Sequence, residues 1–211
     1  NQVQAMKTLV NEFRDYARLP AAQMKALDLN ALVSEVLGLY VTAHDAGRLH
    51  AELGTDLPHI VGDSTQLRQV IHNLVQNALD AVAERSDGSV RVRTEVARTE
   101  QGDVRAVRLQ VIDNGHGFAD KVLKRAFEPY VTTKSKGTGL GLAVVKKIAD
   151  EHGARIRIAN LGVAREAAGG DTAAPPGAAA VTGAQVSLSF SKFAPADGTT
   201  AVAAAPASRT H

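Results

Sequence analysis

Two glycine-rich segments limit what this chain can fold into more than any other feature of the sequence. The first, residues 113–117 (DNGHG), follows a strand-like alternation of apolar residues at 107, 109 and 111. A strand cannot continue through this turn composition, so the pattern predicts a strand that ends in the carboxylate of Asp113, beside flexible backbone.

The second segment, residues 137–142 (GTGLGL), opens a helical pattern of apolar residues. Alternating glycines let backbone N–H groups approach an anion, and the positive end of the following helix points the same way. The segment therefore predicts a phosphate-binding loop. Its G-x-G-x-G spacing differs from the dinucleotide fingerprint, and the P-loop string and the H-R-D and D-F-G strings of protein kinases do not occur.

Composition excludes several classes of protein. The 211 residues are 45% hydrophobic with no cysteine, which suits a globular domain without disulfides or thiolate metal sites. With 24 basic against 22 acidic residues, no nucleic-acid partner is indicated. No apolar run is long enough to span a membrane and no signal peptide opens the chain, so we expect any membrane anchor to lie outside it.

Apolar periodicity predicts the order of the elements along the chain. Helices are expected at 1–18, 28–46, 63–84 and 120–127 and after 141; strands are expected at 48–53, 59–61, 89–96, 105–112, 155–160 and 185–190. The helix at 1–18 either meets a partner helix or packs on its own domain. Residues 164–183 predict a disordered insertion and residues 194–211 a low-complexity tail.

The helix over 63–84 carries polar residues with a shared spacing. Asn73, Asn77 and Asp80 fall at i, i+4 and i+7, so two amides and a carboxylate share one face. Oxygen ligands of this kind suit Mg²⁺, which takes its remaining ligands from substrate phosphates. An ordinary solvated face is the alternative, and the phosphate-binding loop downstream favours the metal.

The segment from Tyr130 to Gly137 has no hydrophobic anchor after Val131 and carries two lysines, Lys134 and Lys136. A basic loop without apolar anchors, placed just before a phosphate-binding loop, predicts a mobile lid.

Four strings together resemble the motifs of a known family. HNLVQNALDAV resembles the N box, DNGHGF the first glycine box, FEPYVTTK the F box and GTGLGL the second glycine box of the GHKL ATPases. Their order and wording are most similar to bacterial sensor histidine kinases of the NtrB and NtrY type. The resemblance implies an α+β two-layer sandwich, the Bergerat fold, with a mixed sheet, helices on one face and ATP held beneath a mobile lid.

The resemblance also implies roles for individual residues. Asp113 would accept the adenine amino group, Asn77 with Asn73 would bind Mg²⁺, and His72 would either assist phosphoryl transfer or be structural. Lys134 would neutralise γ-phosphate charge during transfer. The remaining residues implied to hold the nucleotide are Asp80, Gly115, Gly117, Thr133, Gly137, Thr138, Gly139, Leu140 and Gly141.

One departure from the family concerns the phosphoacceptor. None of the seven histidines is followed by a string resembling the H-box H-E-[IL]-[KR]-N-P. We therefore interpret residues 1–20 as the end of the second helix of a dimerisation domain and 28–193 as the catalytic domain. The implied partners are that dimerisation domain, in a homodimer, and a response regulator, and the implied location is the cytoplasmic part of a membrane-anchored sensor.

Two other functions stay open on the sequence. A clamp ATPase of the gyrase, MutL or heat-shock chaperone type would have a water-activating Glu four residues before the Mg²⁺ asparagine, where this chain has Asn73. A module that binds ATP as a signal and transfers nothing is the second alternative.

Overall fold

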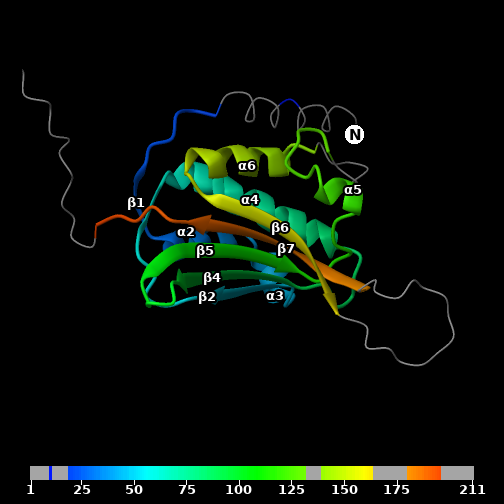
Figure 1. Ribbon diagram of the computed structural model, residues 1–211. Helices are drawn as coiled ribbons and strands as arrows, with labels where there is room; N and C mark the ends of the chain where they lie inside the picture. Colours follow the sequence, from blue (N-terminus) through cyan, green and yellow to red (C-terminus); the bar gives the residue numbers. More distant parts are fainter. Residues whose placement is uncertain (1–9, 11–18, 132–138, 164–179, 196–211) are drawn as a thin grey trace, which may run out of the picture.

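The structure is a computed structural model that describes residues 10, 19–131, 139–163 and 180–195 (Figure 1). The helices of this part are α2 (Leu29–Leu37), α3 (Val41–Asp45), α4 (Ser64–Ala81), α5 (Asp120–Leu123) and α6 (Gly141–Glu151). The strands are β1 (Lys25–Leu27), β2 (Leu49–Leu53), β3 (Ile60–Gly62), β4 (Val90–Arg98), β5 (Val104–Asp113), β6 (Arg155–Val163) and β7 (Ala180–Phe190). No helix in these ranges is long and apolar enough to cross a bilayer.

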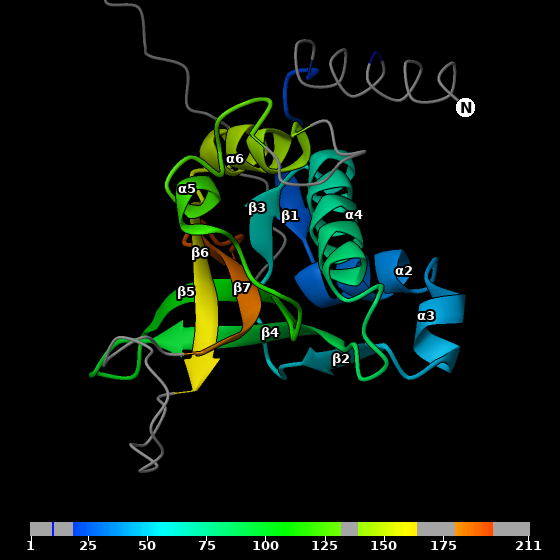
Figure 2. The same ribbon diagram turned by 90° about the vertical axis from the view of Figure 1, so that its right-hand side faces the viewer.

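The main layer is a five-stranded sheet in the order β2-β4-β5-β7-β6. The pair β2–β4 is parallel and the other neighbours are antiparallel, so the sheet is mixed. Helices α4 and α6 lie together on one side of it (Figure 2). This arrangement confirms the predicted α+β two-layer sandwich, and a small separate sheet pairs β1 with β3.

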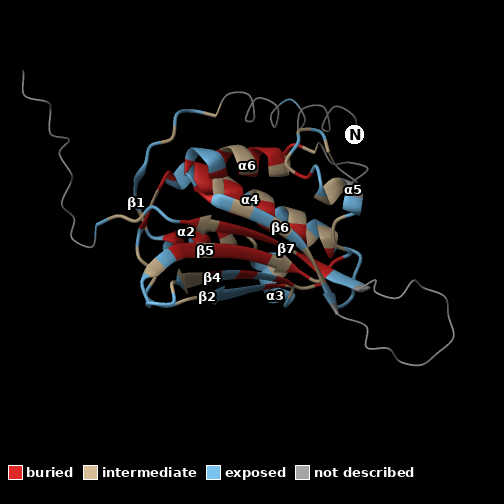
Figure 3. Cartoon of the chain, in the orientation of Figure 1, coloured by how far each residue is buried: buried red, intermediate tan, exposed pale blue. Residues whose placement is uncertain are grey.

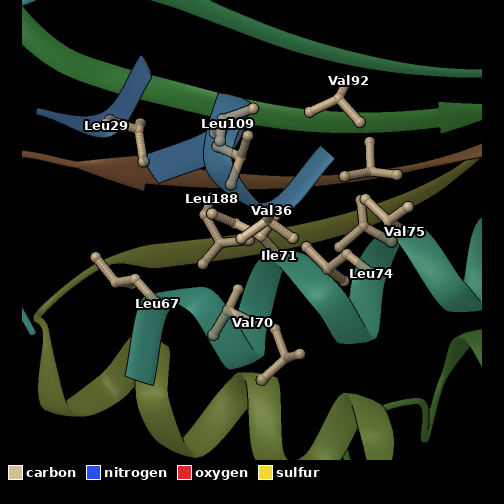
Figure 4. Close-up of a cluster of buried hydrophobic side chains, with 14 of the residues drawn as sticks. Leu29, Val36, Leu67, Val70, Ile71, Leu74, Val75, Val92, Leu109 and Leu188 are labelled. Atoms are coloured by element: carbon tan, nitrogen blue, oxygen red, sulfur yellow. The ribbon is translucent and has the colours of Figure 1, made fainter. Parts of the chain in front are cut away.

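The core lies between α4, α2 and the sheet, and it consists almost wholly of aliphatic side chains. Buried and exposed positions alternate along the first half of β4, because successive strand residues point to opposite faces, whereas most of the central strand β5 is buried (Figure 3). The labelled part of this core contains Leu29, Val36, Leu67, Val70, Ile71, Leu74, Val75, Val92, Leu109 and Leu188 (Figure 4). Because the sequence has few aromatic residues, the core is packed mainly from Leu, Val, Ile and Ala side chains.

Helix α4 is stabilised at both ends. At its start, Asp63 Oδ1 accepts hydrogen bonds from the N–H groups of Thr65 and Gln66, as an N-cap does. Burial pushes the pKa of Asp63 up, but the N–H groups of Gln66, Gln23 and Thr65 outweigh this, and the pKa is lowered. At its end, the Arg48 guanidinium donates to the carbonyl of Val82, where a cation also suits the helix dipole.

A buried histidine joins α4 to α6. His152 follows α6, and its Nε2 accepts the Asp63 N–H at 2.9 Å while its Nδ1 lies 2.8 Å from the Ile148 carbonyl. These contacts place the ring proton on Nδ1, which donates to the Ile148 carbonyl. The ring fixes the start of α4 to the end of α6, which sets how the two helices lie side by side.

The predicted helix over 28–46 is wrong in one respect, since it is two helices. Gly38 ends α2, and the N–H groups of Leu39 and Tyr40 close tighter turns on Val36 and Leu37. Leu39 is 73% exposed, so the apolar stripe is interrupted there. The predicted helix over 120–127 is also shorter, because only Asp120–Leu123 is helical and turns follow it.

The predicted insertion over 164–183 is wrong at its end. Strand β7 begins at Ala180, because Ala180 and Val181 pair with Val163 and Gly162 of β6 beyond a register shift at Leu161–Gly162. Residue Ala194, predicted as tail, donates its N–H to His59 O. The predictions for 1–9, 11–18, 164–179 and 196–211 lie outside the described residues, and so do residues 132–137 of the predicted lid. Strand β1 was not predicted.

We expect His152→Leu to lower the free energy of unfolding by about 1–3 kcal/mol, because the buried Asp63 N–H loses its acceptor. Urea unfolding of this variant should be compared with His50→Leu, which changes an exposed histidine on β2 and should alter stability by roughly 0.5 kcal/mol or less. Equal losses in the two variants would contradict the role given to His152.

Candidate functional site

Asp113 ends β5 in the interior of the sheet. Its backbone is in register with Val90 of β4 and Ala184 of β7, and only 8% of the residue is exposed. Oδ1 accepts the Gly115 N–H at 2.8 Å. Burial raises the pKa of Asp113, and the N–H groups of Gly115 and Ala184 offset only part of that rise. The charged form of Asp113 therefore lowers the stability of the fold. A neutral side chain would be more favourable at this position if its role were only structural.

The turn after Asp113 packs directly on the end of α4. A Cβ placed on Gly115 would lie 2.7 Å from the Ala81 carbonyl oxygen and 3.0 Å from the Ala81 Cβ. Only a residue without a side chain fits there. The side chain of Asn114 holds the same turn from the other side through two hydrogen bonds of 2.8 Å. Its Oδ1 accepts the Ser89 N–H, and its Nδ2 donates to the Asp87 carbonyl.

A second contact holds the far end of this turn. The side chain of Asn160 of β6 accepts the Phe118 N–H at 2.7 Å and donates to the Phe118 carbonyl at 2.8 Å. One amide side chain thus makes the two hydrogen bonds to Phe118 that the backbone of a neighbouring strand residue would make. Gly117 has φ +72°, and a Cβ there would lie 2.9 Å from Asn160 Oδ1. Sequence reasoning missed Asn160, because no local pattern marks a strand residue whose partner lies 42 positions away.

The polar face of α4 lies toward the start of α6. Asn73 and Asn77 are half-buried and Asp80 is exposed, with Gln76 Nε2 donating to Asp80 Oδ1 at 2.9 Å. A Cβ on Gly141, the first residue of α6, would lie 3.4 Å from Asn77 Nδ2. The predicted metal face and the predicted phosphate-binding loop therefore meet.

The start of α6 has no capping side chain. Its N-cap is Leu140, whose buried apolar side chain makes no capping hydrogen bond. Just before it, Gly139 has φ +72° and its carbonyl accepts the Tyr130 N–H at 3.1 Å. The described residues on either side of segment 132–138 therefore meet beside α6. The predicted residues Thr133, Lys134, Gly137 and Thr138 lie outside the described part of the chain.

His72 lies on α4 next to the other polar residues and is exposed. Its Nδ1 is 2.7 Å from the hydroxyl oxygen of Tyr40, and the two rings are 5.7 Å apart. Burial, and secondarily the charge of Asp80, raise the pKa of Tyr40 to about 12, so its hydroxyl stays protonated at neutral pH. The ring of His72 is therefore oriented by the connection between α2 and α3.

The donor set of this region is chemically selective. Among the described residues, no cluster of three or more His, Cys, Asp or Glu side chains could hold a metal. The amides of Asn73 and Asn77 and the carboxylate of Asp80 are hard oxygen donors, which suit Mg²⁺ that keeps water or phosphate ligands. The site thus fits a cation that is brought in with an anionic ligand.

We expect Asp113→Asn to raise the melting temperature of the protein without ligand at pH 7. Because the pKa of this carboxyl is raised in the fold, the cost of its charge is fully present above the folded pKa. That cost disappears as the pH falls below the ordinary aspartate pKa of about 3.9. Melting curves across this range test the expectation, with Asp103→Asn in an exposed loop as the control; a variant that is less stable at pH 7 contradicts it.

Comparisons with known proteins agree with this geometry. Residues 62–195 match the family described as histidine kinase-, DNA gyrase B-, and HSP90-like ATPase. An NtrY-like sensor histidine kinase of Rickettsia conorii is 36% identical over 164 residues, which are 78% of this chain and 26% of that protein. The chain spans about a quarter of the length of such relatives.

Two solved structures resemble the fold. The catalytic domain of the histidine kinase ThkA in a nucleotide-free form superposes with a TM-score of 0.60 at 27% identity, covering 81% of this chain and 96% of that domain. Full-length ShkA in complex with AMPPNP gives a TM-score of 0.66 at 26% identity, covering 90% of this chain and 36% of ShkA. This chain therefore belongs to the family of histidine kinase-, DNA gyrase B- and HSP90-like ATPases, within its sensor histidine kinase branch.

Proposed function

We propose that this chain is the ATP-binding catalytic part of a sensor histidine kinase and transfers the γ-phosphoryl group of ATP to a histidine. One observation carries the proposal: helix α4 touches both glycine-rich segments. Ala81 meets Gly115 at the first segment, and Asn77 faces Gly141 at the second. A ligand that contacts both segments would have its base beside Ala81, at the end of α4, and its phosphates beside Asn77, one turn earlier.

Asp113 is the proposed determinant of base recognition. A carboxylate only accepts hydrogen bonds, so it favours the amino group of adenine over the carbonyl oxygen that guanine has at the same place. The energetic cost of keeping this group charged in the fold supports a role in binding. Gly115 and Gly117 would let the ring pack against bare backbone.

Asn77, assisted by Asn73 and Asp80, is the proposed Mg²⁺ site. When bound, the ion would neutralise charge on the phosphates and orient the γ-phosphoryl group. Asn77 is well placed for this because it lies across from the start of α6. In the same proposal, the backbone at Gly139, Leu140 and Gly141 holds the phosphates, and the sequence adds Gly137, Thr138 and Thr133 to that set.

Phosphoryl transfer depends mainly on placing donor and acceptor in line, so the remaining residues have positioning roles. Lys134 is proposed from the sequence to neutralise the γ-phosphate. His72 either assists the transfer or has a structural role, and its contact with Tyr40 holds the ring in one orientation in both cases.

The proposed acceptor is a histidine in an H-box of a dimerisation domain, since this sequence contains no such string. The proposal includes a homodimer of the parent protein, a response regulator that receives the phosphoryl group, and a cytoplasmic location below a membrane anchor. These features come from the resemblance to sensor histidine kinases.

The direct test is phosphorylation in trans. The chain is incubated with γ-labelled ATP, Mg²⁺ and a separate dimerisation domain that carries an H-box. We expect that domain to be labelled, and the label to be acid-labile and base-stable, as phosphohistidine is. The labelling should be slow, because the effective concentration that a natural tether provides, of order millimolar, is missing. Rapid ATP hydrolysis with no acceptor would favour the clamp ATPase, and ATP binding without any transfer would favour a sensing module.

We expect Gly141→Ala to weaken binding of Mg²⁺-ADP by about tenfold or more, equivalent to roughly 1.4 kcal/mol, without loss of stability. The new methyl group would lie 3.4 Å from Asn77 Nδ2, in the space between the two helices, and alanine suits the first turn of a helix. Calorimetric titration gives the affinity and thermal melting the stability. Gly38→Ala at the end of α2 is the control, and unchanged affinity in Gly141→Ala would exclude this placement of the phosphates.

A further inference from the structure

The face of the sheet that is turned away from α4 and α6 carries a hollow of about 720 Å³. It extends over β4, β5, β7 and β6, so it is separated from the candidate nucleotide site by the whole sheet (Figure 2). Among the described residues, its lining contains no carboxylate. The arginines that line it are Arg98, Arg105, Arg108, Arg155 and Arg157.

The strand register arranges the lining in two cross-strand rows. In one row Ser189 of β7 lies between Arg108 of β5 and Arg155 of β6. In the next row Ser187 lies between Gln110 and Arg157. Because neighbouring strands are about 4.8 Å apart, the outer members of each row are about 10 Å apart, with a serine hydroxyl on the floor between them.

The positive charge is compensated on one side only. Arg108 pairs with Glu95 at 2.7 Å, and Glu95 also lies 3.5 Å from Arg93. On β6, by contrast, Arg155 and Arg157 are exposed and have no ion-pair partner within the described part of the chain. The β6 side therefore presents two guanidinium groups, whose fork of N–H donors matches the oxygens of a phosphate.

Gln110 offers a hydrogen-bond acceptor in the hollow, whereas the arginines offer donors. The residue is 9% exposed and lines the hollow, and its Oε1 is buried without a hydrogen-bond partner among the described residues. A buried acceptor without a donor is costly, so a ligand that supplies a hydroxyl group beside its anionic group would satisfy it. A phosphorylated molecule with hydroxyl groups could contact both the arginines and Gln110, so we expect it to bind more tightly than inorganic phosphate.

We propose that this hollow is a second binding site, for a small phosphorylated molecule that bears hydroxyl groups, such as a sugar phosphate. Arg155 and Arg157 bind the phosphate, the hydroxyls of Ser187 and Ser189 donate to it from the floor, and Gln110 accepts from a ligand hydroxyl. The site is independent of ATP binding between α4 and α6.

The experiment uses the whole chain with its nucleotide site saturated by Mg²⁺-ADP, and ribose 5-phosphate as the probe. Amide chemical shifts are followed by nuclear magnetic resonance during titration. We expect saturable shifts on β5, β6 and β7, and a loss of affinity of tenfold or more in Arg155→Ala/Arg157→Ala. The control Arg68→Ala/Arg85→Ala removes the same charge from residues that are ion-paired elsewhere, and it should bind as the unmodified chain does.

Several outcomes would overturn the proposal. These are no saturable shift on these strands, equal weakening in both double variants, equal binding of ribose, or equal binding of inorganic phosphate, which would mean an adventitious ion only. Tighter binding of an acidic peptide than of ribose 5-phosphate would identify the hollow as a protein-docking surface. If the alanine variant does not fold, Arg155→Lys/Arg157→Lys keeps the charge, loses the forked donors, and should also bind more weakly.

Discussion

The packing of α4 is the interaction on which the rest of this structure depends. One face of the helix is buried against the sheet by a continuous aliphatic stripe, and its ends are fixed by Asp63 and Arg48. With the helix held in this way, its polar face has a defined direction. The two glycine-rich segments then meet the helix at Ala81 and Asn77, and the proposed nucleotide site lies between these contacts.

The buried carboxylate of Asp113 carries a charge that its surroundings disfavour. Its pKa is raised because burial disfavours the charge, so the residue costs stability at neutral pH. The surrounding N–H groups reduce this cost without removing it. The role proposed for Asp113, as the acceptor that selects a ligand donor, would explain why a charged group is kept at the end of a central strand.

The local parts of the site were predictable from the sequence, whereas the parts made by distant contacts were not. The face of α4 and the end of β5 follow from periodicity and turn composition, which are local. Asn160 became visible only when β6 was placed beside the first glycine-rich turn, and β1 is three residues with no alternation to mark it. The break at Gly38 was missed because, in the sequence, Tyr40 continues the helical spacing of Val33, Val36 and Leu37.

Hydrogen exchange, measured with and without a non-hydrolysable ATP analogue and Mg²⁺, tests whether the nucleotide lies between α4 and α6. If the ligand lies between α4 and α6 with its base at Asp113, exchange should slow together in residues 73–80, 113–117 and 139–142. Protection confined to one of these segments, or found only on β6 and β7 across the sheet, would contradict the account.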